Sequence, residues 1–405
     1  PDDRSKSIFP SDLFTTRDFS QNTFRRVDLA QPDCTVNVVR CWDIDVLNTL
    51  DGFNIQPRIS IPFSGPIDVS TVNSDSIFLV SLGSTRGRGS VGDRVGINQI
   101  VWDAATNTLH AESEELLEQH TRYAVIVTDR VRDANGRRLK DDSFGRFHSR
   151  RHSGNNREAF LNEFRENLLE AFLNAKRHHG RDKIVAASVF TTMSTSGTLE
   201  KIRDQIKAAT PGPTNFNVGS NGERAVFPLD TITAAQFVRQ TGTAPVFTPG
   251  FLPVPALNVV PGAVSTLAFG SFASPNYLAP DVTVPTMGSR TGLPVPQAVN
   301  DIHFNLTLPA GPRPAAGWPV AIFGHGFGDS RFGAFFTIAS VMASRGIATI
   351  AINVVGHGGG PLGTVNVLRT AGNPVVVPAG GRGFDQNGDG LIGSTEGSAA
   401  AAPRL

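Results

Sequence analysis

Oxygen-bearing side chains recur at regular spacing near the end of this 405-residue chain. Residues 385–396 have the sequence DQNGDGLIGSTE, which matches the calcium loop D-x-N-x-D-G-x-I-x-x-x-E at every defined position. A hard cation such as Ca²⁺ needs many oxygen ligands around it, and Gly390 allows the sharp turn. The pattern therefore predicts a single structural Ca²⁺ site rather than a plain acidic turn. The expected ligands are Asp385, Asn387, Asp389, the carbonyl of Leu391 and Glu396.

A second stretch that could take part in chemistry is a glycine-rich turn between apolar segments. Residues 319–360 have the sequence PVAIFGHGFGDSRFGAFFTIASVMASRGIATIAINVVGHGGG. The pattern predicts a strand over Pro319–Phe323, a helix capped by Ser330 and ending at Gly346, and a strand over Ile347–Ile352. Such spacing is typical of a parallel crossover. A membrane span over Phe335–Val355 is disfavoured because Arg345 lies at its centre.

The strand and the His325-Gly326-Phe327 turn resemble the oxyanion turn of α/β-hydrolase lipases and esterases. The resemblance implies that the backbone N–H of Phe327 points at the negative charge that develops on the substrate oxygen. Preorganised N–H donors of this kind act in a dry pocket, and glycines on both sides of a turn let it present them. The alternative is an ordinary turn between strand and helix with an incidental histidine.

The nucleophile of a serine hydrolase is missing from these residues. No G-x-S-x-G motif, the usual strand-to-helix elbow of the nucleophile, occurs in the chain. We therefore expect no nucleophile in this chain, and we expect it to be the N-terminal portion of a longer enzyme. A C-terminal segment or second chain would then complete the hydrolase sheet, whose edge would otherwise stay open.

The first half of the chain predicts a different architecture. Short strands with turn residues between them recur over residues 51–150, as in SIFLVSL at 76–82 and TRYAVIVT at 121–128, which favours a β-sandwich. The order of these strands, with the D-x-N-G turn at 133–136, resembles bacterial Ig-like modules of cell-surface proteins. In such modules the sandwich usually serves as a spacer or binding platform.

Composition and cysteine use limit the function classes. The net charge of +1 argues against a nucleic-acid partner, and 40% apolar residues allow sizeable cores. Cys34 and Cys41 are close enough for a bridge across a local loop, which fits an exported protein, although two reduced cysteines near a core remain the alternative. The polar start of the chain is typical of one that follows a removed leader.

Together these features predict a multidomain α/β plus all-β fold. The expected parts are an extended segment with the cysteine pair (1–50), an Ig-like β-sandwich (51–150), a helix-strand-helix and Pro/Gly-rich connecting region (151–300), and the first part of an α/β-hydrolase fold with the calcium loop (301–405). The chain resembles bacterial extracellular and surface lipases, including surface lysophospholipases. The resemblance implies a secreted or outer-membrane-surface serine esterase that hydrolyses carboxylic esters of lipids. The alternative is a non-catalytic surface or adhesive protein that keeps these parts as scaffold.

Overall fold

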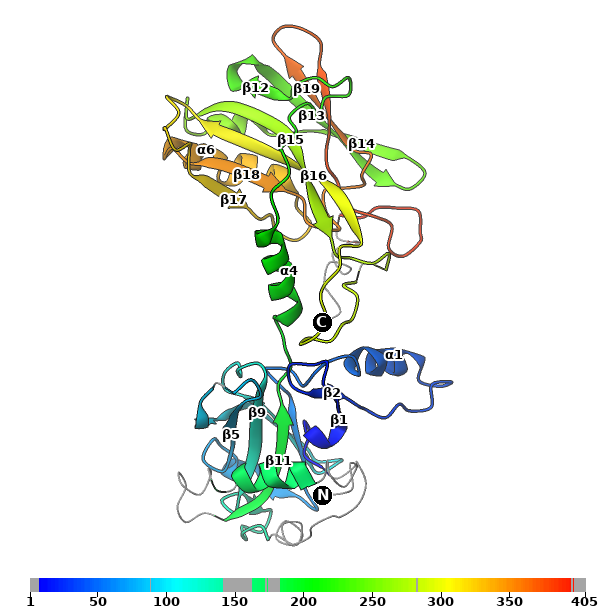
Figure 1. Ribbon diagram of the computed structural model, residues 1–405, viewed down its shortest axis with the longest axis vertical. Coiled ribbons are helices and arrows are strands. Elements are labelled where there is room, and N and C mark those ends of the chain that lie inside the picture. Colours follow the sequence, from blue (N-terminus) through cyan, green and yellow to red (C-terminus); the bar gives the residue numbers. More distant parts are fainter. Residues whose placement is uncertain are drawn as a thin grey trace. The chain divides into compact units, whose positions relative to one another are not determined.

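The computed structural model describes residues 7–87, 89–140, 162–171, 173, 183–281, 283–394 and 396. The chain divides into two compact units, the first made of Pro1–Lys207 and Thr286–Pro294 and the second of Ala208–Pro285 and Val295–Arg404. β-Sheets dominate both units, and helices are few (Figure 1).

The first unit contains a β-sandwich. Its strands are β3 (Ile59–Pro62), β4 (Ile67–Asp68), β5 (Ile77–Ser84), β6 (Val91–Val95), β7 (Ile97–Asp103), β8 (Thr108–Ser113), β9 (Thr121–Thr128), β10 (Arg132–Asp133) and β11 (Ile184–Thr191). One sheet has the order β3-β8-β7 and the other the order β11-β9-β5-β6, while β4 pairs with β10. All of these pairs are antiparallel.

The strand β5 is buried on both faces, which explains its uninterrupted apolar sequence. Successive side chains of a strand point to opposite faces of the sheet. Ile77 and Leu79 therefore join the core between the two sheets. Phe78 and Val80 pack on the other face, in a cluster with residues of the helical stretch 162–171. The predicted strands at 76–82 and 121–128 are thus confirmed.

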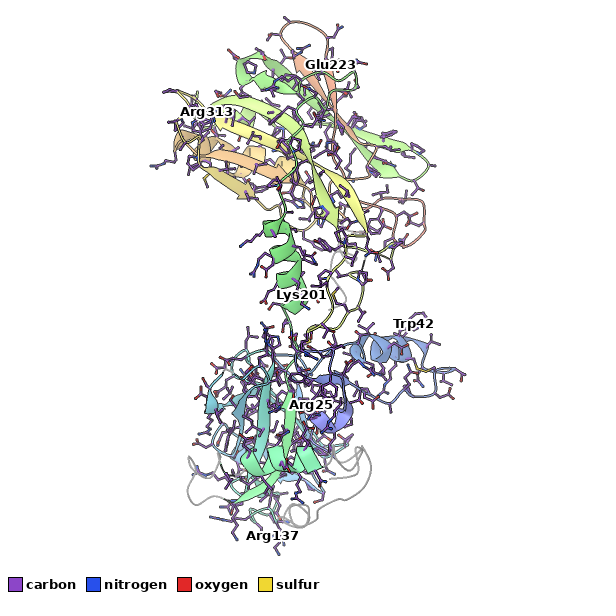
Figure 2. All side chains as sticks on the ribbon, in the orientation of Figure 1. Arg25, Trp42, Arg137, Lys201, Glu223 and Arg313 are labelled. Atoms are coloured by element: carbon purple, nitrogen blue, oxygen red, sulfur yellow. A yellow bond between two sulfur atoms is a disulfide. The ribbon has the colours of Figure 1, made fainter. Side chains whose placement is uncertain are left out.

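A segment before the sandwich is anchored to it by buried charges. It contains β1 (Thr15–Arg17), β2 (Arg25–Val27) and α1 (Val38–Leu47). The Nε of Arg25 lies 3.3 Å from Oδ2 of Asp12, and both side chains are almost fully buried. Asp12 also accepts hydrogen bonds from the backbone N–H and the hydroxyl of Thr191 on β11, at 2.9 and 2.8 Å. Glu163 completes the group at 2.6 Å from Nη2 of Arg25, a residue labelled in Figure 2.

Residues Thr286–Pro294 belong to the first unit although the chain on both sides of them belongs to the second. The hydroxyl of Ser289 donates to the buried carboxylate of Asp51 at 2.5 Å, and the backbone N–H of Ser289 donates to the side chain of Gln21 at 2.8 Å. Lys201, on α4 (Gly197–Ala208), donates to the carbonyl of Gly292 at 2.6 Å. The chain therefore passes between the two units three times.

The second unit pairs two sheets around one apolar core. Its elements are β12 (Val226–Pro228), β13 (Ile232–Gly242), β14 (Val246–Phe251), β15 (Val264–Asn276), β16 (Ala298–Pro309), β17 (Val320–Phe323), α5 (Ala334–Thr337), α6 (Ala339–Ser344), β18 (Ala348–Ile352), β19 (Thr364–Arg369) and β20 (Val375–Pro378). The sheet orders are β12-β15-β16-β18-β17 and β14-β13-β19-β20. In the described residues, β17 and β18 form the parallel pair, and the remaining neighbours are antiparallel.

The predicted crossover is present as β17, two short helices and β18. The hydroxyl of Ser330 accepts from the backbone N–H of Phe332 at 3.4 Å, and Gly346 ends the helical stretch with φ +73°. The predicted single helix is broken at Ile338, where the backbone leaves the α region. Strand β17 lies at the end of its sheet, and its Val320 and Ile322 side chains are 57% and 82% exposed. None of the described helices is both long and apolar enough to cross a membrane.

The range 151–300 differs most from the expectation of a connecting region. It contains β11, which pairs with β9 as part of the sandwich, and the long strands β13 and β15 of the second unit. The proline and glycine residues of this range fall largely between these strands or near their ends. The α/β character of the second unit is limited to the β17–β18 crossover, so the predicted hydrolase portion is not shown.

Candidate functional sites

The acidic loop at 385–396 brings together the carboxylates that the sequence singled out. One carboxylate oxygen each from Asp385, Asp389 and Glu396 lies within 4.8 Å of the others. Backbone N–H groups hold these oxygens in place: Gly390 donates to Asp385 at 2.8 Å, Leu391 to Asp389 at 2.8 Å, and Gly393 to Glu396 at 2.9 Å. Three like charges at this distance repel one another, and a divalent cation would remove that repulsion.

Two features of the sequence fold the loop in this way. Gly388 and Gly390 adopt φ values of +80° and +84°, which favour glycine. Ile392 is buried, and its backbone N–H donates to the carbonyl of Thr241 on β13 at 2.9 Å, so the loop is tied to the second unit.

The other two predicted ligands make hydrogen bonds within the same loop. Leu391 forms an antiparallel bridge with Gly242 in which the bonds run from the flanking residues. Its own N–H and C=O therefore point away from β13, and the N–H donates to Asp389 within the loop. The side-chain oxygen of Asn387 accepts from the N–H of Asp389 at 2.9 Å. This donor set fits a hard, oxygen-preferring cation.

The His325-Gly326-Phe327 turn is open to solvent. The Phe327 side chain is 77% exposed, and none of the three residues lines the cavity beside Tyr123 or the cavity beside Gly380. The ring of His325 is fully engaged by backbone groups: its Nε2 accepts from the N–H of Val354 at 3.2 Å, and its Nδ1 lies 2.9 Å from the carbonyl of Gly326. Because Nε2 accepts, Nδ1 carries the proton and donates to that carbonyl.

A second histidine lies against this turn. The ring centroid of His357 is 4.9 Å from that of His325 and 6.0 Å from that of Phe327. His357 is buried; its Nδ1 lies 3.0 Å from the carbonyl of Val355, and its Nε2 has no partner among the described residues. No serine of a G-x-S-x-G elbow accompanies these rings, so the oxyanion role of Phe327 stays a prediction.

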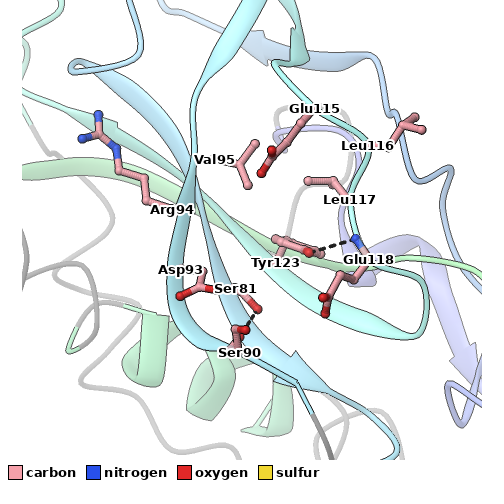
Figure 3. A pocket seen from close by; sticks show the side chains of 10 residues that line it. All are labelled: Ser81, Ser90, Asp93, Arg94, Val95, Glu115, Leu116, Leu117, Glu118 and Tyr123. Atoms are coloured by element: carbon pink, nitrogen blue, oxygen red, sulfur yellow. Dashed lines mark hydrogen bonds between the residues drawn. The ribbon is translucent and has the colours of Figure 1, made fainter.

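The sandwich of the first unit carries a cavity of about 340 Å³ that the sequence did not indicate. Figure 3 shows Tyr123 at its centre, with its hydroxyl accepting from the backbone N–H of Glu118 at 3.1 Å. Burial raises the pKa of Tyr123 above its ordinary value. Asp93, Glu115 and Glu118 also line the cavity, whereas Arg94 points away and bonds to Asp75. The cavity is therefore acidic.

Comparison with known proteins identifies one part of the chain. Residues 44–148 match the family model of the bacterial Ig-like domain. The chain contains a bacterial Ig-like domain. The expected Ig-like module is thus confirmed. An Ig-like domain of this family fits a protein associated with the cell surface. Nothing in these comparisons supports an α/β-hydrolase lipase, and no curated protein matches the chain.

Two solved S-layer proteins are similar to the chain at low identity. The N-terminal part of the bacterial S-layer protein SbsC matches at 10% identity with a TM-score of 0.19, over 62% of this chain and 38% of that one. The S-layer protein rSbsC(31-844) matches at 9% identity with a TM-score of 0.20, over 68% of this chain and 26% of that one. The chain therefore spans well under half of either structure.

The structure also decides the state of the two cysteines. Cys34 and Cys41 form a disulfide, which confirms the predicted bridge and excludes the reduced alternative. The bridge joins the start of α1 to the residues before it. The sequence did not indicate the buried Asp12–Arg25–Glu163 group, because its members lie far apart along the chain.

Proposed function

We propose that this chain is a non-catalytic protein of the bacterial cell surface, in which the Ig-like domain serves as a spacer or binding platform. The match of residues 44–148 to the bacterial Ig-like family is the observation that carries the proposal. The matched region contains most of a sandwich with a closed apolar core, so its loops are free to vary and to contact partners. A position on the exterior of the outer membrane is part of the proposal.

The exposed turn at His325 supports a non-catalytic assignment. Stabilisation of an oxyanion requires donors that are held in a site from which water is excluded. Here the Phe327 side chain is 77% exposed, and both ring nitrogens of His325 are used to hold backbone groups. In this proposal the turn joins β17 to the following helices and has no chemical role.

The acidic loop would bind one structural Ca²⁺ through Asp385, Asn387, Asp389, Leu391 and Glu396. The ion would neutralise three carboxylates that now lie within 4.8 Å of one another. Because Ile392 in the same loop bonds to β13, the bound ion would stabilise the second unit.

Two measurements test the proposal. A serine-directed fluorophosphonate is added to the purified chain, with a known serine esterase as positive control, and intact mass is recorded. We expect no adduct on this chain, and a stoichiometric adduct would refute the non-catalytic assignment. On intact bacteria, external protease should degrade the protein while a periplasmic marker survives. Protection until the outer membrane is broken would refute the surface location.

A second candidate function rests on the edge strand β17. Its position at the end of a sheet, with Val320 and Ile322 exposed, would allow a further strand from a C-terminal segment or a second chain to pair with it. The completed sheet could then supply the serine of an esterase acting on lipid esters. Fluorophosphonate labelling of a longer species or an associated fragment, with none on this chain, would favour this candidate.

A further inference from the structure

The second unit contains a buried arginine without a counter-charge. Arg331 is 0% exposed, and its Nη2 donates to the carbonyl of Pro378 at 3.0 Å. Its Nε and Nη1 have no hydrogen-bond partner, and no carboxylate pairs with it among the described residues. Burial lowers the pKa of Arg331 to about 9, so the group still carries its proton at neutral pH. A buried charge is costly unless something nearby compensates it.

The guanidinium lies directly behind the wall of a cavity. A Cβ built on Gly380 would come within 3.5 Å of Nη1 of Arg331 and within 2.5 Å of Cβ of His303. Gly380 and His303 both line this cavity, whose volume is about 530 Å³. Because Gly380 has no side chain, the guanidinium lies close to backbone that lines the cavity, and the protein between them screens its field weakly.

A second guanidinium lines the same cavity. Nη1 of Arg382 donates to the backbone carbonyl of Asn353 at 3.1 Å, and no ion pair joins Arg382 to a described carboxylate. Nε and Nη2 of Arg382 have no hydrogen-bond partner among the described residues, which leaves two donors for a planar anion. Asn353 also accepts from the N–H of Arg331 at 2.7 Å and donates to the carbonyl of Gly380 at 2.7 Å. Asn353 thus holds Arg331 and Gly380 through its side-chain amide and Arg382 through its backbone carbonyl.

The charge balance and the lining define the class of ligand. Arg382 and Asp301 line the cavity with opposite charges, and Arg331 behind the wall leaves these three groups with one net positive charge. His303 adds no fixed charge near neutral pH, because burial, followed by the charge of Arg331, lowers its pKa. Apolar walls come from Leu278, Ile302, Val355 and Phe384. The volume lies within the range of about 300–1,000 Å³ that is typical of small-molecule sites.

We propose that this cavity binds a small organic carboxylate with an apolar body. Nε and Nη2 of Arg382 would donate to the two carboxylate oxygens, and the charge of Arg331 behind Gly380 would add to the attraction without contact. The apolar walls would cover the rest of the ligand. The residues that line this site do not include those of the acidic loop or of the His325-Gly326-Phe327 turn.

Benzoate and its neutral analogue benzamide test the proposal on the full chain, with affinities measured by ligand-observed NMR titration. We expect benzoate to bind at least about ten-fold more tightly than benzamide, because a hydrogen bond to a charged group is the stronger kind. Arg382→Gln should weaken the binding of benzoate by about ten-fold or more and remove the preference for benzoate over benzamide. Arg313→Gln, which changes an exposed arginine of the same unit (Figure 2), should leave both affinities unchanged.

Arg331→Gln provides an independent arm, because it removes a charge that does not contact the ligand. It should reduce the preference for benzoate while leaving the affinity for benzamide unchanged. If this variant does not fold, the affinities of Arg382→Gln still test the proposal. Inorganic phosphate distinguishes a carboxylate site from a general anion site. The proposal is overturned if benzoate does not bind, if benzoate and benzamide bind alike, if Arg382→Gln binds benzoate as tightly as the unmodified chain, or if phosphate displaces benzoate at equal concentration.

Discussion

The buried charge group of the first unit offers the sharpest test of how that unit is held together. Asp12→Asn removes the negative charge that lies 3.3 Å from Nε of Arg25, where the two side chains are 0% and 3% exposed. Removing one partner of a buried ion pair typically costs about 3–5 kcal/mol, since the other charge stays buried. Arg25 keeps its contact with Glu163 at 2.6 Å, so we expect the lower end, about 3 kcal/mol.

The expected loss can be measured in two ways. For a unit of this size, about 3 kcal/mol corresponds to a fall of about 6–12 °C in the midpoint of its calorimetric transition. The backbone N–H of Thr191 donates to Asp12 at 2.9 Å, so hydrogen exchange in β11 should accelerate as well. Asp33→Asn, at an exposed carboxylate, is the matched control and should shift the midpoint by little. Equal midpoints for the two variants would show that the buried pair does not hold the segment in place.

Three further predictions concern other parts of the chain. Gly52→Ala should destabilise the first unit by about 1–3 kcal/mol, because a Cβ there would meet the backbone of residues 191–193 at 2.7–2.8 Å. Gly65→Ala is the control and should change the stability little, because a Cβ there would meet nothing within 4 Å. Equal urea midpoints for the two variants would contradict this prediction. Ca²⁺ at about one hundred times its Kd should stabilise the second unit by about 2.7 kcal/mol. Glu396→Gln should weaken that gain while the exposed Asp230→Asn keeps it, and a midpoint unmoved by calcium or chelator would remove the metal proposal. Burial alone would raise the pKa of Glu163, but Arg25 and Arg17 lower it below its ordinary 4.5. Its stabilising contribution is therefore present above about pH 4.5 and lost as the pH falls through the lowered value, so Glu163→Gln should show a shallower loss of stability below pH 4.5 than the unmodified chain.

Local patterns predicted the parts of the fold that local physics decides. The strand over 121–128 is predicted at its observed bounds because an apolar run, residues 123–127, stands between polar residues. The loop at 385–396 is predicted because the spacing of its oxygen-bearing residues and glycines defines its shape. The crossover from β17 to β18 followed from two apolar runs and a capped helix between them.

The same local patterns do not predict pairings between distant segments. Strand β11 belongs to the sandwich through hydrogen bonds to β9, more than fifty residues earlier in the chain. Nothing in the sequence of β11 indicates that β9 is its partner. The cavity beside Gly380 draws on residues from 276 to 384, and Arg331 is an ordinary charged residue in the sequence. Its lack of a counter-charge becomes visible only when its neighbours in space are known.

The return of Thr286–Pro294 to the first unit has a consequence for biosynthesis. A chain leaving the ribosome cannot complete that unit when Lys207 emerges, because Asp51 still lacks the hydroxyl of Ser289. By the time Ser289 is made, β12 to β15 of the other unit have also been made. Maturation of the earlier portion therefore waits on synthesis of the later one, and a nascent chain that stops before residue 286 would leave the Asp51 carboxylate without one of its partners.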